Sequence, residues 1–233
     1  MTSSSLSNAQ DRARRIRLII FDVDGVLTDG GIWLFPAAAP SSGPTGEPAR
    51  WWNHETGEQA AQTESKGDHA NSSQSAVEAK GFSAHDGTGI AMAKLAGIKC
   101  AIITRRVSDT VALRARDLRL EYLYMGQAYK MQAVREMMAK EGIGLDEIAY
   151  VGDDVIDLPV MRVCGLAVAV ANAREQVKAA AHYVTPHEGG HGAGRDAIEF
   201  ILEAKGILEK TIEAFIDERH PLPASMDIGK GGF

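Results

Sequence analysis

Two aspartates separated by one residue follow a short apolar segment near the start of the chain. Residues 18–21 read Leu-Ile-Ile-Phe, and Asp22 and Asp24 come next, on either side of a valine. Open α/β proteins build their ligand sites at the carboxyl edge of the sheet, so a strand here would deliver both carboxylates to such a site. Two like charges this close repel each other unless a cation or a shared proton lies between them. The pair therefore predicts a divalent metal site in which one carboxylate remains free for chemistry.

Further polar residues follow the later apolar segments of the chain. They are, in chain order, Thr104, Lys130, Asp153, Asp154 and Asp157. Each comes at the predicted carboxyl end of a strand or at the helix start just beyond it. The carboxyl ends of parallel strands share one edge of a sheet, so we expect these residues to converge in space although they are far apart in the chain.

The residue types in this set suit the transfer of a phosphoryl group. A carboxylate can attack phosphorus and form an aspartyl-phosphate, which splits hydrolysis into two easier steps. A second acid can protonate the departing alcohol and then deprotonate the water that releases phosphate. A hard divalent cation held by carboxylate oxygens lets an anionic nucleophile approach an anionic phosphate. Threonine and lysine supply a hydrogen bond and a positive charge for phosphate oxygens.

Apolar strands and helical patterns alternate along the chain and would position these residues. The predicted strands are Leu18–Phe21, Ile98–Thr104, Tyr122–Met125, Ile148–Gly152, Leu166–Ala169 and His182–Thr185. The predicted helices are Gly89–Leu95, Val107–Leu118, Lys130–Glu141, Leu158–Val163, Ala173–Ala180 and Gly194–Glu218. Strands that are apolar throughout, joined by helices, are typical of a parallel sheet covered on both faces. We therefore predict an α/β fold, a doubly wound parallel sheet with the first strand central.

One segment departs from this alternation. Residues 36–76 are rich in Pro, Ala, Ser and Gly and have no sustained apolar period, so they cannot bury enough surface to offset their ordering entropy. We predict a long disordered insertion here, in which Trp51 and Trp52 either dock on a surface or stay exposed. Two strand-like pieces, Gly31–Phe35 and Val77–Phe82, flank the insertion and are predicted to pair as a hairpin.

Composition limits the classes of protein. The chain of 233 residues is 45% hydrophobic with a net charge of −6, the balance of a soluble single domain. Its basic residues cluster only at Arg12–Arg17, which we interpret as a solvated tail, so we expect no nucleic acid partner. The chain shows no apolar leader and no segment of membrane-spanning length, and Cys100 and Cys164 are expected to be buried thiols. These features favour a cytoplasmic enzyme or binding protein that ends in an irregular tail at 221–233.

The ordered motifs DVDGVLTDG, IITRR, a lysine and GDDVIDLP resemble the haloacid dehalogenase-like phosphatase superfamily. The resemblance implies that Asp22 is the nucleophile and that Asp24 is the general acid and base. It also implies that Thr104 and Lys130 bind phosphate. The second aspartate of the pair favours the phosphatases of this superfamily over its dehalogenases, which do not need that acid.

The same resemblance implies a magnesium site. Its ligands would be Asp22, Asp153 and the backbone carbonyl of Asp24, with Asp154 holding metal-bound water. These assignments are carried over by position in the motifs.

A closer resemblance extends from about Arg17 to Leu208, apart from the insertion. The motifs DVDGVLTDGGI, FSAHDGTGI, YMGQAYK, AYVGDDVIDLPVM, GLAVAVANA and HYVTPHEGGHGAGRDAI are similar to those of the 3-deoxy-D-manno-octulosonate (KDO) 8-phosphate phosphatase subfamily. Members of that subfamily lack a cap domain and project a β-hairpin after the nucleophile strand. They form homotetramers in which a neighbouring subunit helps to close the active site. The resemblance implies a capless Rossmann-like domain of the superfamily that hydrolyses a small phosphorylated sugar acid.

The chain departs from the subfamily in the parts that select the substrate. Where the subfamily usually has Ile-Thr-Gly-Arg, this chain has Ile103, Thr104, Arg105 and Arg106, and the insertion occupies the place of a short hairpin tip. A glycine at that position permits close backbone approach, whereas Arg105 either points away or adds charge near the substrate. Arg106 and Arg114 could meet a sugar-acid carboxylate or could be ordinary surface arginines.

Several other residues keep two interpretations. Asp157 stands two positions before a proline and could cap a helix or join the site. Residues 187–191 read HEGGH, which matches a zinc-protease pattern, but that pattern needs a helix and the glycines disfavour one. A loop near the active-site rim is the preferred interpretation, with His191 or Arg195 facing substrate. Asp86 could cap a helix or line the site.

Three alternative functions differ from KDO 8-phosphate hydrolysis. One is a related phosphatase for a nine-carbon keto-acid phosphate. The second is a phosphoacceptor signalling domain, in which acids, a threonine and a lysine also meet on a doubly wound sheet. The third is a non-catalytic assembly module, which the intact Asp22, Asp24, Lys130 and Asp153 disfavour.

Overall fold

The computed structural model describes most of the chain outside the insertion and the ends. The described residues are 3–36, 51–52, 59–60 and 76–217. The insertion predicted at 36–76 therefore lies largely outside them, and the tail predicted at 221–233 lies wholly outside them. Within these ranges no helix reaches the length and apolar character that a membrane span requires. The chain divides into two compact units, of which the first comprises Met1–Gly31 and Lys80–Phe233 and the second Ile32–Ala79.

A six-stranded parallel sheet forms the centre of the first unit, in the order β10-β9-β8-β1-β6-β7. Its strands are β1 Leu18–Phe21, β6 Lys99–Ile103, β7 Tyr122–Tyr124, β8 Ile148–Gly152, β9 Leu166–Ala169 and β10 Tyr183–Val184. The chain runs outward from β1 through β6 and β7, then crosses to β8 on the other side of β1. The neighbours β1 and β8 thus mark the switch point at which open α/β sheets bind ligands. The predicted parallel sheet with a central first strand is confirmed.

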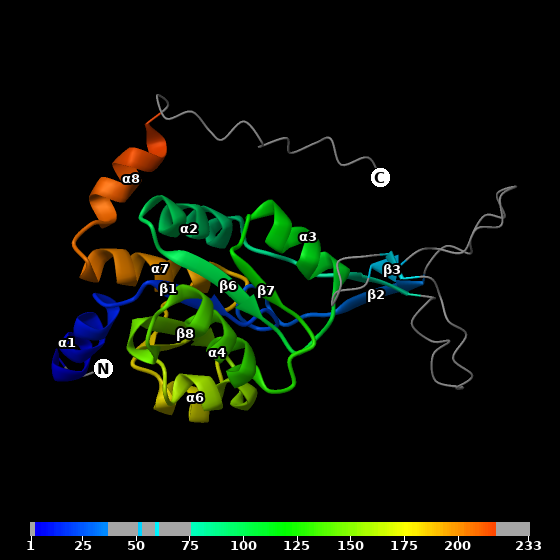
Figure 1. Cartoon of the computed structure of the whole chain (residues 1–233), viewed down its shortest axis with the longest axis horizontal. Helices are drawn as coiled ribbons and strands as arrows, with labels where there is room; N and C mark the ends of the chain where they lie inside the picture. Colours follow the sequence, from blue (N-terminus) through cyan, green and yellow to red (C-terminus); the bar gives the residue numbers. More distant parts are fainter. Residues whose placement is uncertain (1–2, 37–50, 53–58, 61–75, 218–233) are drawn as a thin grey trace, which may run out of the picture. The chain divides into compact units, whose positions relative to one another are not determined.

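Helices cover both faces of this sheet. Figure 1 shows α2, α3 and α7 on one side and α4 and α6 on the other, and α5 contacts α4 and α6. Their bounds are α2 Ala84–Leu95, α3 Asp109–Asp117, α4 Lys130–Glu141, α5 Leu158–Met161, α6 Glu175–Ala180 and α7 Ala193–Ala204. Because helices lie on both faces, β1 and β8 are buried along their whole length.

Helix ends follow local signals in the sequence. Ser83 and Ser108 precede α2 and α3, and their hydroxyl oxygens accept hydrogen bonds from backbone N–H groups of the first turn. The single helix predicted over Gly194–Glu218 is wrong, because the chain turns at Gly206, where φ is 69°, and continues as α8 Leu208–Ile216. A glycine in the left-handed region commonly ends a helix.

The segment Arg12–Arg17 is not a tail, although Arg14, Arg15 and Arg17 are exposed to solvent as the interpretation required. Helix α1, Ser3–Ala13, leads into this segment, and its Ala9 and Ala13 are buried. The guanidinium of Arg12 donates a hydrogen bond of 2.9 Å to the carbonyl oxygen of Gly165. This hydrogen bond of Arg12 links the first helix to the amino edge of the sheet.

The second unit contains two antiparallel strand pairs. The predicted hairpin is confirmed, since β2 Trp33–Pro36 pairs with β5 Ala76–Ala79. Within the insertion, β3 Trp51–Trp52 pairs with β4 Gln59–Ala60. The hairpin exposes large apolar side chains, namely those of Ile32, Trp33, Leu34, Phe35 and Val77.

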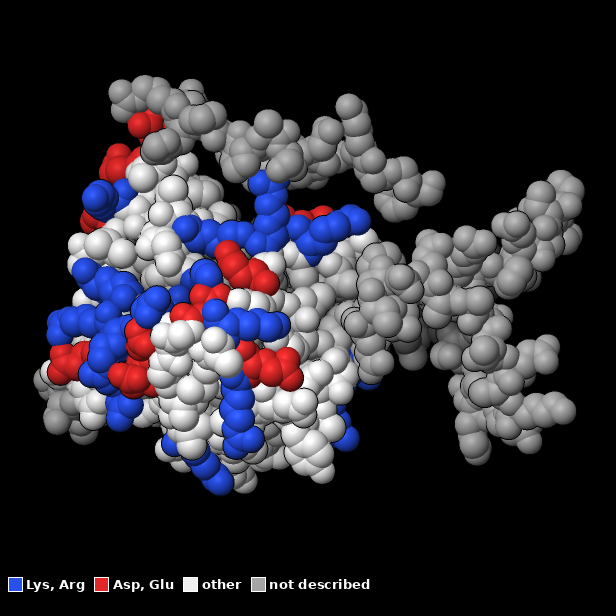
Figure 2. All heavy atoms as spheres, in the orientation of Figure 1, with Lys and Arg blue, Asp and Glu red and all other residues white. Residues whose placement is uncertain are grey.

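Charged side chains of both signs mix on the described surface that Figure 2 shows. Lys and Arg lie next to Asp and Glu rather than gathering into one positive field. Proteins that bind nucleic acid mainly through phosphates instead present clustered Lys and Arg.

Candidate active site

Three carboxylates meet at the carboxyl edge of the sheet, where β1 and β8 lie side by side. Asp22 follows β1, Asp153 follows β8, and Asp157 ends the short 3-10 helix η3, Val155–Asp157. One carboxylate oxygen from each of the three lies within 4.8 Å of the others. Asp22 is 3% exposed and Asp157 is wholly buried, so negative charge is concentrated here with little water to screen it.

Burial, and then this crowding, raises the pKa values of two of the carboxyls. Burial, then the charge of Asp157, raises the pKa of Asp22 from 3.8 to about 6, although Lys130 opposes the shift. Burial raises the pKa of Asp153 from 3.8 to about 7, and the charges of Asp22, Asp157 and Asp154 add to it. A divalent cation would reverse both shifts, because it stabilises the ionised forms.

The donor atoms fit a hard divalent cation. Oδ1 of Asp153 is buried and has no hydrogen-bond partner among the described residues, which is costly for a carboxylate oxygen unless an ion contacts it. The backbone of the loop after β1 lies close to Asp153, since a Cβ at Gly25 would lie 2.2 Å from Oδ2 of Asp153. Oxygen donors of this kind are the ligands that Mg²⁺ and Ca²⁺ prefer.

A buried lysine lies against this cluster. Nζ of Lys130, in the first turn of α4, lies 2.9 Å from Oδ2 of Asp22 and 2.6 Å from Oδ1 of Asp157. It also donates a hydrogen bond of 2.9 Å to the hydroxyl of Tyr150, which in turn donates one of 2.7 Å to Oδ1 of Asp157. Lys130 is 4% exposed, so these contacts hold its charge in one place beside Asp22.

Asp157 belongs to the site. Its Oδ2 accepts hydrogen bonds from the backbone N–H groups of Asp153, at 3.1 Å, and Asp154, at 3.4 Å. It therefore fixes both Lys130 and the turn that presents Asp153. The side chain of Asp154 lies apart from the three-carboxylate cluster, since it is exposed and its Oδ1 accepts a hydrogen bond of 2.7 Å from the N–H of Val155.

Two cations flank Asp24. Its side chain is 23% exposed, forms an ion pair with the buried ammonium of Lys80, and lies 3.9 Å from Nε of Arg106. Sequence reasoning missed Lys80, which lies inside a strand-like segment and matches no motif. It also missed Tyr150, although a tyrosine in an otherwise aliphatic buried strand signals a hydroxyl that needs a partner.

Thr104 and the two arginines are placed differently. Thr104, 2% exposed, directly follows β6, the neighbour of β1, and its hydroxyl accepts a hydrogen bond of 3.3 Å from the N–H of Arg106. Arg114 turns toward the start of α2. There it donates a hydrogen bond of 3.4 Å to the carbonyl of Ser83, and its guanidinium carbon lies 5.8 Å from the centre of the Phe82 ring. The structure brings Arg106 to Asp24 and leaves Arg114 packed on Phe82.

Residues 187–191 form turns rather than a helix, as predicted, so the two histidines of the zinc-protease pattern do not share a helix face. Nδ1 of His191 lies 2.9 Å from the carbonyl oxygen of Gly189. Nε of Arg195 donates a hydrogen bond of 2.5 Å to Glu199. These hydrogen bonds of His191 and Arg195 are made to residues outside the carboxylate cluster.

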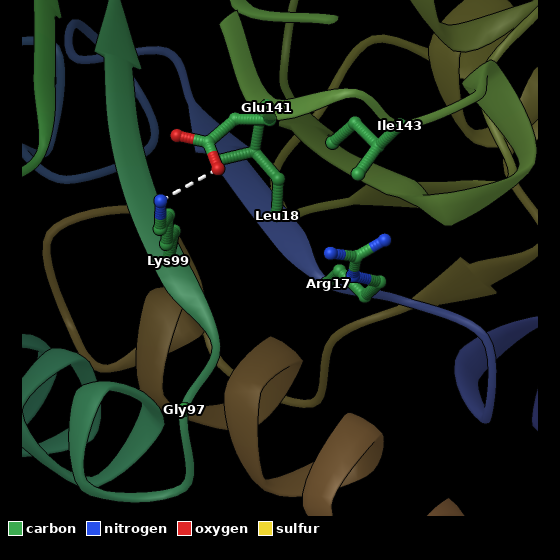
Figure 3. Close-up of a pocket in the computed structure, with 6 residues that line it drawn as sticks. All are labelled: Arg17, Leu18, Gly97, Lys99, Glu141 and Ile143. Atoms are coloured by element: carbon green, nitrogen blue, oxygen red, sulfur yellow. Dashed lines mark hydrogen bonds and ion pairs between the residues drawn. The ribbon is translucent and has the colours of Figure 1, made fainter.

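A small cavity lies at the opposite, amino edge of the sheet (Figure 3). It holds about 50 Å³, room for no more than a few water molecules. Two charged residues of its wall pair with each other, since Nζ of Lys99 lies 2.6 Å from Glu141 (Figure 3). The third, Arg17, pairs with Glu147 outside the cavity wall at 3.0 Å. Its size and pairing make it a poor candidate for a substrate site.

The doubly wound sheet, the aspartate pair after β1 and the lysine beside it define a haloacid dehalogenase-like hydrolase. Residues 89–195 match the family model described as haloacid dehalogenase-like hydrolase. The chain is 36% identical over 204 residues to the 3-deoxy-D-manno-octulosonate 8-phosphate phosphatase of Salmonella typhi, a match that covers 88% of each chain. It belongs to the 3-deoxy-D-manno-octulosonate 8-phosphate phosphatase family, and it is a phosphatase that hydrolyses phosphomonoesters. The resemblance inferred from its motifs is confirmed.

Solved structures agree with this assignment. The enzyme of the same name from Yersinia pestis is 36% identical, with a TM-score of 0.66 over 87% of this chain and 89% of that one. The one from Moraxella catarrhalis is 32% identical, with a TM-score of 0.69 over 90% of this chain and 98% of that one. The Moraxella structure is a complex with a magnesium ion, a phosphate ion and a KDO molecule.

Proposed function

We propose that the protein is a Mg²⁺-dependent phosphatase that converts KDO 8-phosphate to KDO and phosphate. The observation that carries the proposal is the buried Asp22–Asp153–Asp157 cluster beside Lys130, with an unpartnered oxygen on Asp153. The relative that binds magnesium, phosphate and KDO supports both the metal and the substrate. Bound Mg²⁺, held by Asp22, Asp153 and the backbone carbonyl of Asp24, with Asp154 behind a water, would neutralise charge on the phosphate.

The residues of the chain divide the reaction between them. A carboxylate oxygen of Asp22 attacks phosphorus, so an O–P bond to Asp22 forms as the ester O–P bond breaks. Asp24 gives its proton to the departing alcohol oxygen. It then takes a proton from the water that attacks the aspartyl-phosphate, which releases phosphate and restores Asp22. Thr104 and Lys130 bind the phosphate oxygens, and Lys130 lies 2.9 Å from Asp22.

Asp24, the proposed acid and base, lies between two cationic side chains, those of Lys80 and Arg106. Arg106 is exposed and adjoins Asp24, so it can also meet the carboxylate of a sugar acid. Arg114 is a second candidate to bind the sugar-acid carboxylate, and to do so its side chain must leave its contact with Phe82.

We also propose that the protein acts as a homotetramer. The hairpin exposes Trp33, Leu34 and Phe35 to 62%, 64% and 52%, and exposed large apolar side chains of this kind are often covered by another protein surface. Exposed apolar side chains also follow the carboxyl ends of the strands, with Tyr129 just before Lys130 at 85%. If the hairpin of a neighbouring subunit packed at the carboxyl edge of the sheet, it would cover the apolar side chains of the hairpin and those that follow the strand ends. Light scattering that reports a monomer would contradict this part.

The protein is proposed to work in the cytoplasm. Both of its cysteines, Cys100 and Cys164, are buried free thiols, as expected from the sequence. Free thiols are typical of reducing compartments, where disulfides are rare.

Phosphate release from a panel of phosphorylated sugars tests the substrate. We expect the highest kcat/KM for KDO 8-phosphate, dependence on Mg²⁺, and loss of activity with a chelator. A higher kcat/KM for a nine-carbon keto-acid phosphate would overturn the substrate and keep the reaction. The variant Arg105→Gly tests the same point at an exposed residue, where the motif resemblance implies a glycine. It should change the preference within the panel and not the Mg²⁺ requirement.

A further inference from the structure

A glycine-rich loop, residues 187–192, packs backbone to backbone on the loop that follows the aspartate pair. The N–H of Gly190 donates a hydrogen bond of 2.9 Å to the carbonyl oxygen of Val26. A Cβ at Gly189 would lie 1.8 Å from the carbonyl oxygen of Gly25. Only glycine allows this approach, so the position of the loop after the aspartate pair depends on the glycine-rich loop 187–192.

The glycine-rich loop is held from its other side as well. Oδ1 of Asn172 accepts a hydrogen bond of 3.0 Å from the N–H of Gly189. The carbonyl of His187 accepts one of 3.2 Å from the N–H of Ala171. The N–H of His187 in turn donates one of 2.9 Å to Oδ2 of Asp196, in the first turn of α7.

A buried carboxylate fixes the helix that follows this loop. Asp86 of α2 is 3% exposed, and its Oδ1 accepts a hydrogen bond of 2.9 Å from the N–H of Arg195. A Cβ at Gly194 would lie 3.1 Å from the same oxygen. Asp86 therefore does not cap the helix it was expected to precede, because it lies within α2, whose N-cap is Ser83; its carboxylate instead binds the first turn of α7. A carboxylate at a helix amino terminus is stabilised by the exposed N–H groups there.

We propose that loop 187–192, anchored by Asn172 and by Asp86 through α7, is a brace that positions the Gly25–Val26 peptide and, through it, the adjoining carbonyl of Asp24, with Gly189 as its central positioning residue. This inference rests on the proposed function, in which the carbonyl of Asp24 is a magnesium ligand. A side chain at Gly189 would push Gly25 by about 1 Å, while metal–ligand distances tolerate only about 0.2 Å.

The variant Gly189→Ala tests the brace, with Gly165→Ala as the matched control. A Cβ at Gly165 would meet a backbone oxygen, that of Asp146, at 2.2 Å, a similar clash at the amino end of β9. We expect both variants to lose stability. Only Gly189→Ala should weaken Mg²⁺ binding in calorimetry, by about 10-fold or more. Equal Mg²⁺ affinities in the two variants would overturn the brace.

Hydrogen exchange supplies a readout that needs no metal. In the metal-free protein, Gly189→Ala should lower the protection of the amides between residues 22 and 30, and Gly165→Ala should leave it unchanged. The milder Asn172→Ala, which creates no clash, should lower the same protection to a smaller degree. Unchanged protection in both Gly189→Ala and Asn172→Ala would refute the brace. If the wild type binds no Mg²⁺ while Gly189→Ala and Asn172→Ala still lower the protection of residues 22–30, the proposed function is refuted and the brace is not.

Discussion

The affinity for Mg²⁺ should fall steeply as the solution becomes acidic. In the metal-free site the pKa of Asp22 is raised to about 6 and that of Asp153 to about 7, chiefly by burial and then by neighbouring carboxylates. Magnesium binds the ionised carboxylates, so protons compete with it below these values. Above about pH 7 the ion displaces few protons, and below about pH 6 it displaces two.

These two equilibria set the size of the effect. Between about pH 8 and about pH 5.5, competition at Asp153 weakens apparent binding by about 30-fold and competition at Asp22 by about 4-fold, or about 100-fold together.

The same pKa shifts also make the stability of the metal-free protein depend on pH. Both carboxyls hold protons more tightly in the folded than in the unfolded chain, so the stability of the metal-free protein falls as the pH rises from about 4 through about 7. Bound Mg²⁺ should remove this decline.

Calorimetric titration with Mg²⁺ at both pH values, in two buffers of different ionisation enthalpy, measures the affinity and the protons released. Asp153→Asn is the control, because it removes the carboxyl with the higher pKa and should bind Mg²⁺ weakly with a smaller pH dependence. An affinity for the wild type that changes less than about 3-fold between the two pH values would refute this reasoning.

Three further predictions concern single side chains. Asp24→Asn keeps the backbone carbonyl, so Mg²⁺ affinity should persist while kcat falls by about 10²- to 10⁴-fold in steady-state assays. Tyr150→Phe removes the buried hydroxyl that joins the lysine and a carboxylate of the site, and should lower the free energy of unfolding by about 1–3 kcal/mol in urea titrations. The neutral ring of His182 accepts a hydrogen bond of 2.8 Å from the N–H of Ala167, and burial lowers its pKa below 6.5. The stability advantage of the wild type over His182→Gln should therefore be full above about pH 6.5 and shrink as the pH falls below it.

Each of these has an opposing outcome. Unchanged kcat in Asp24→Asn would remove Asp24 from the acid–base role. Unfolding of Tyr150→Phe at the wild-type denaturant concentration would show that the hydroxyl contributes nothing. A wild-type advantage over His182→Gln that grows toward low pH would reverse the assigned protonation state.

The sheet could be predicted because its strands are buried on both faces. Ile148–Gly152 is apolar throughout and ends at the carboxylates, so its limits and its role are both visible in the chain. The helix Ser3–Ala13 was not foreseen, since only small residues such as Ala9 and Ala13 face inward and the rest of the segment is polar. The partner of Arg12 is a backbone carbonyl far along the chain, which no local pattern reveals.

The site was predictable to the extent that it follows strand ends. Asp22, Lys130 and Asp153 meet because parallel strands and their helices share one edge. Lys80 reaches Asp24 across the insertion, a pairing between residues with no fixed spacing. Asp157 could be interpreted in two ways until its contact with Lys130 was seen.

The central claim, that Asp22 is the nucleophile of a Mg²⁺-dependent phosphatase, is tested most directly by trapping the covalent enzyme. The protein is mixed with KDO 8-phosphate and Mg²⁺, quenched with acid within milliseconds, and its peptides are analysed by mass spectrometry. We predict a phosphoryl group on the peptide containing Asp22, absent with chelator, and neither phosphopeptide nor turnover in Asp22→Asn. Turnover of Asp22→Asn at the wild-type rate, with no phosphorylated peptide in the wild type, would contradict the claim.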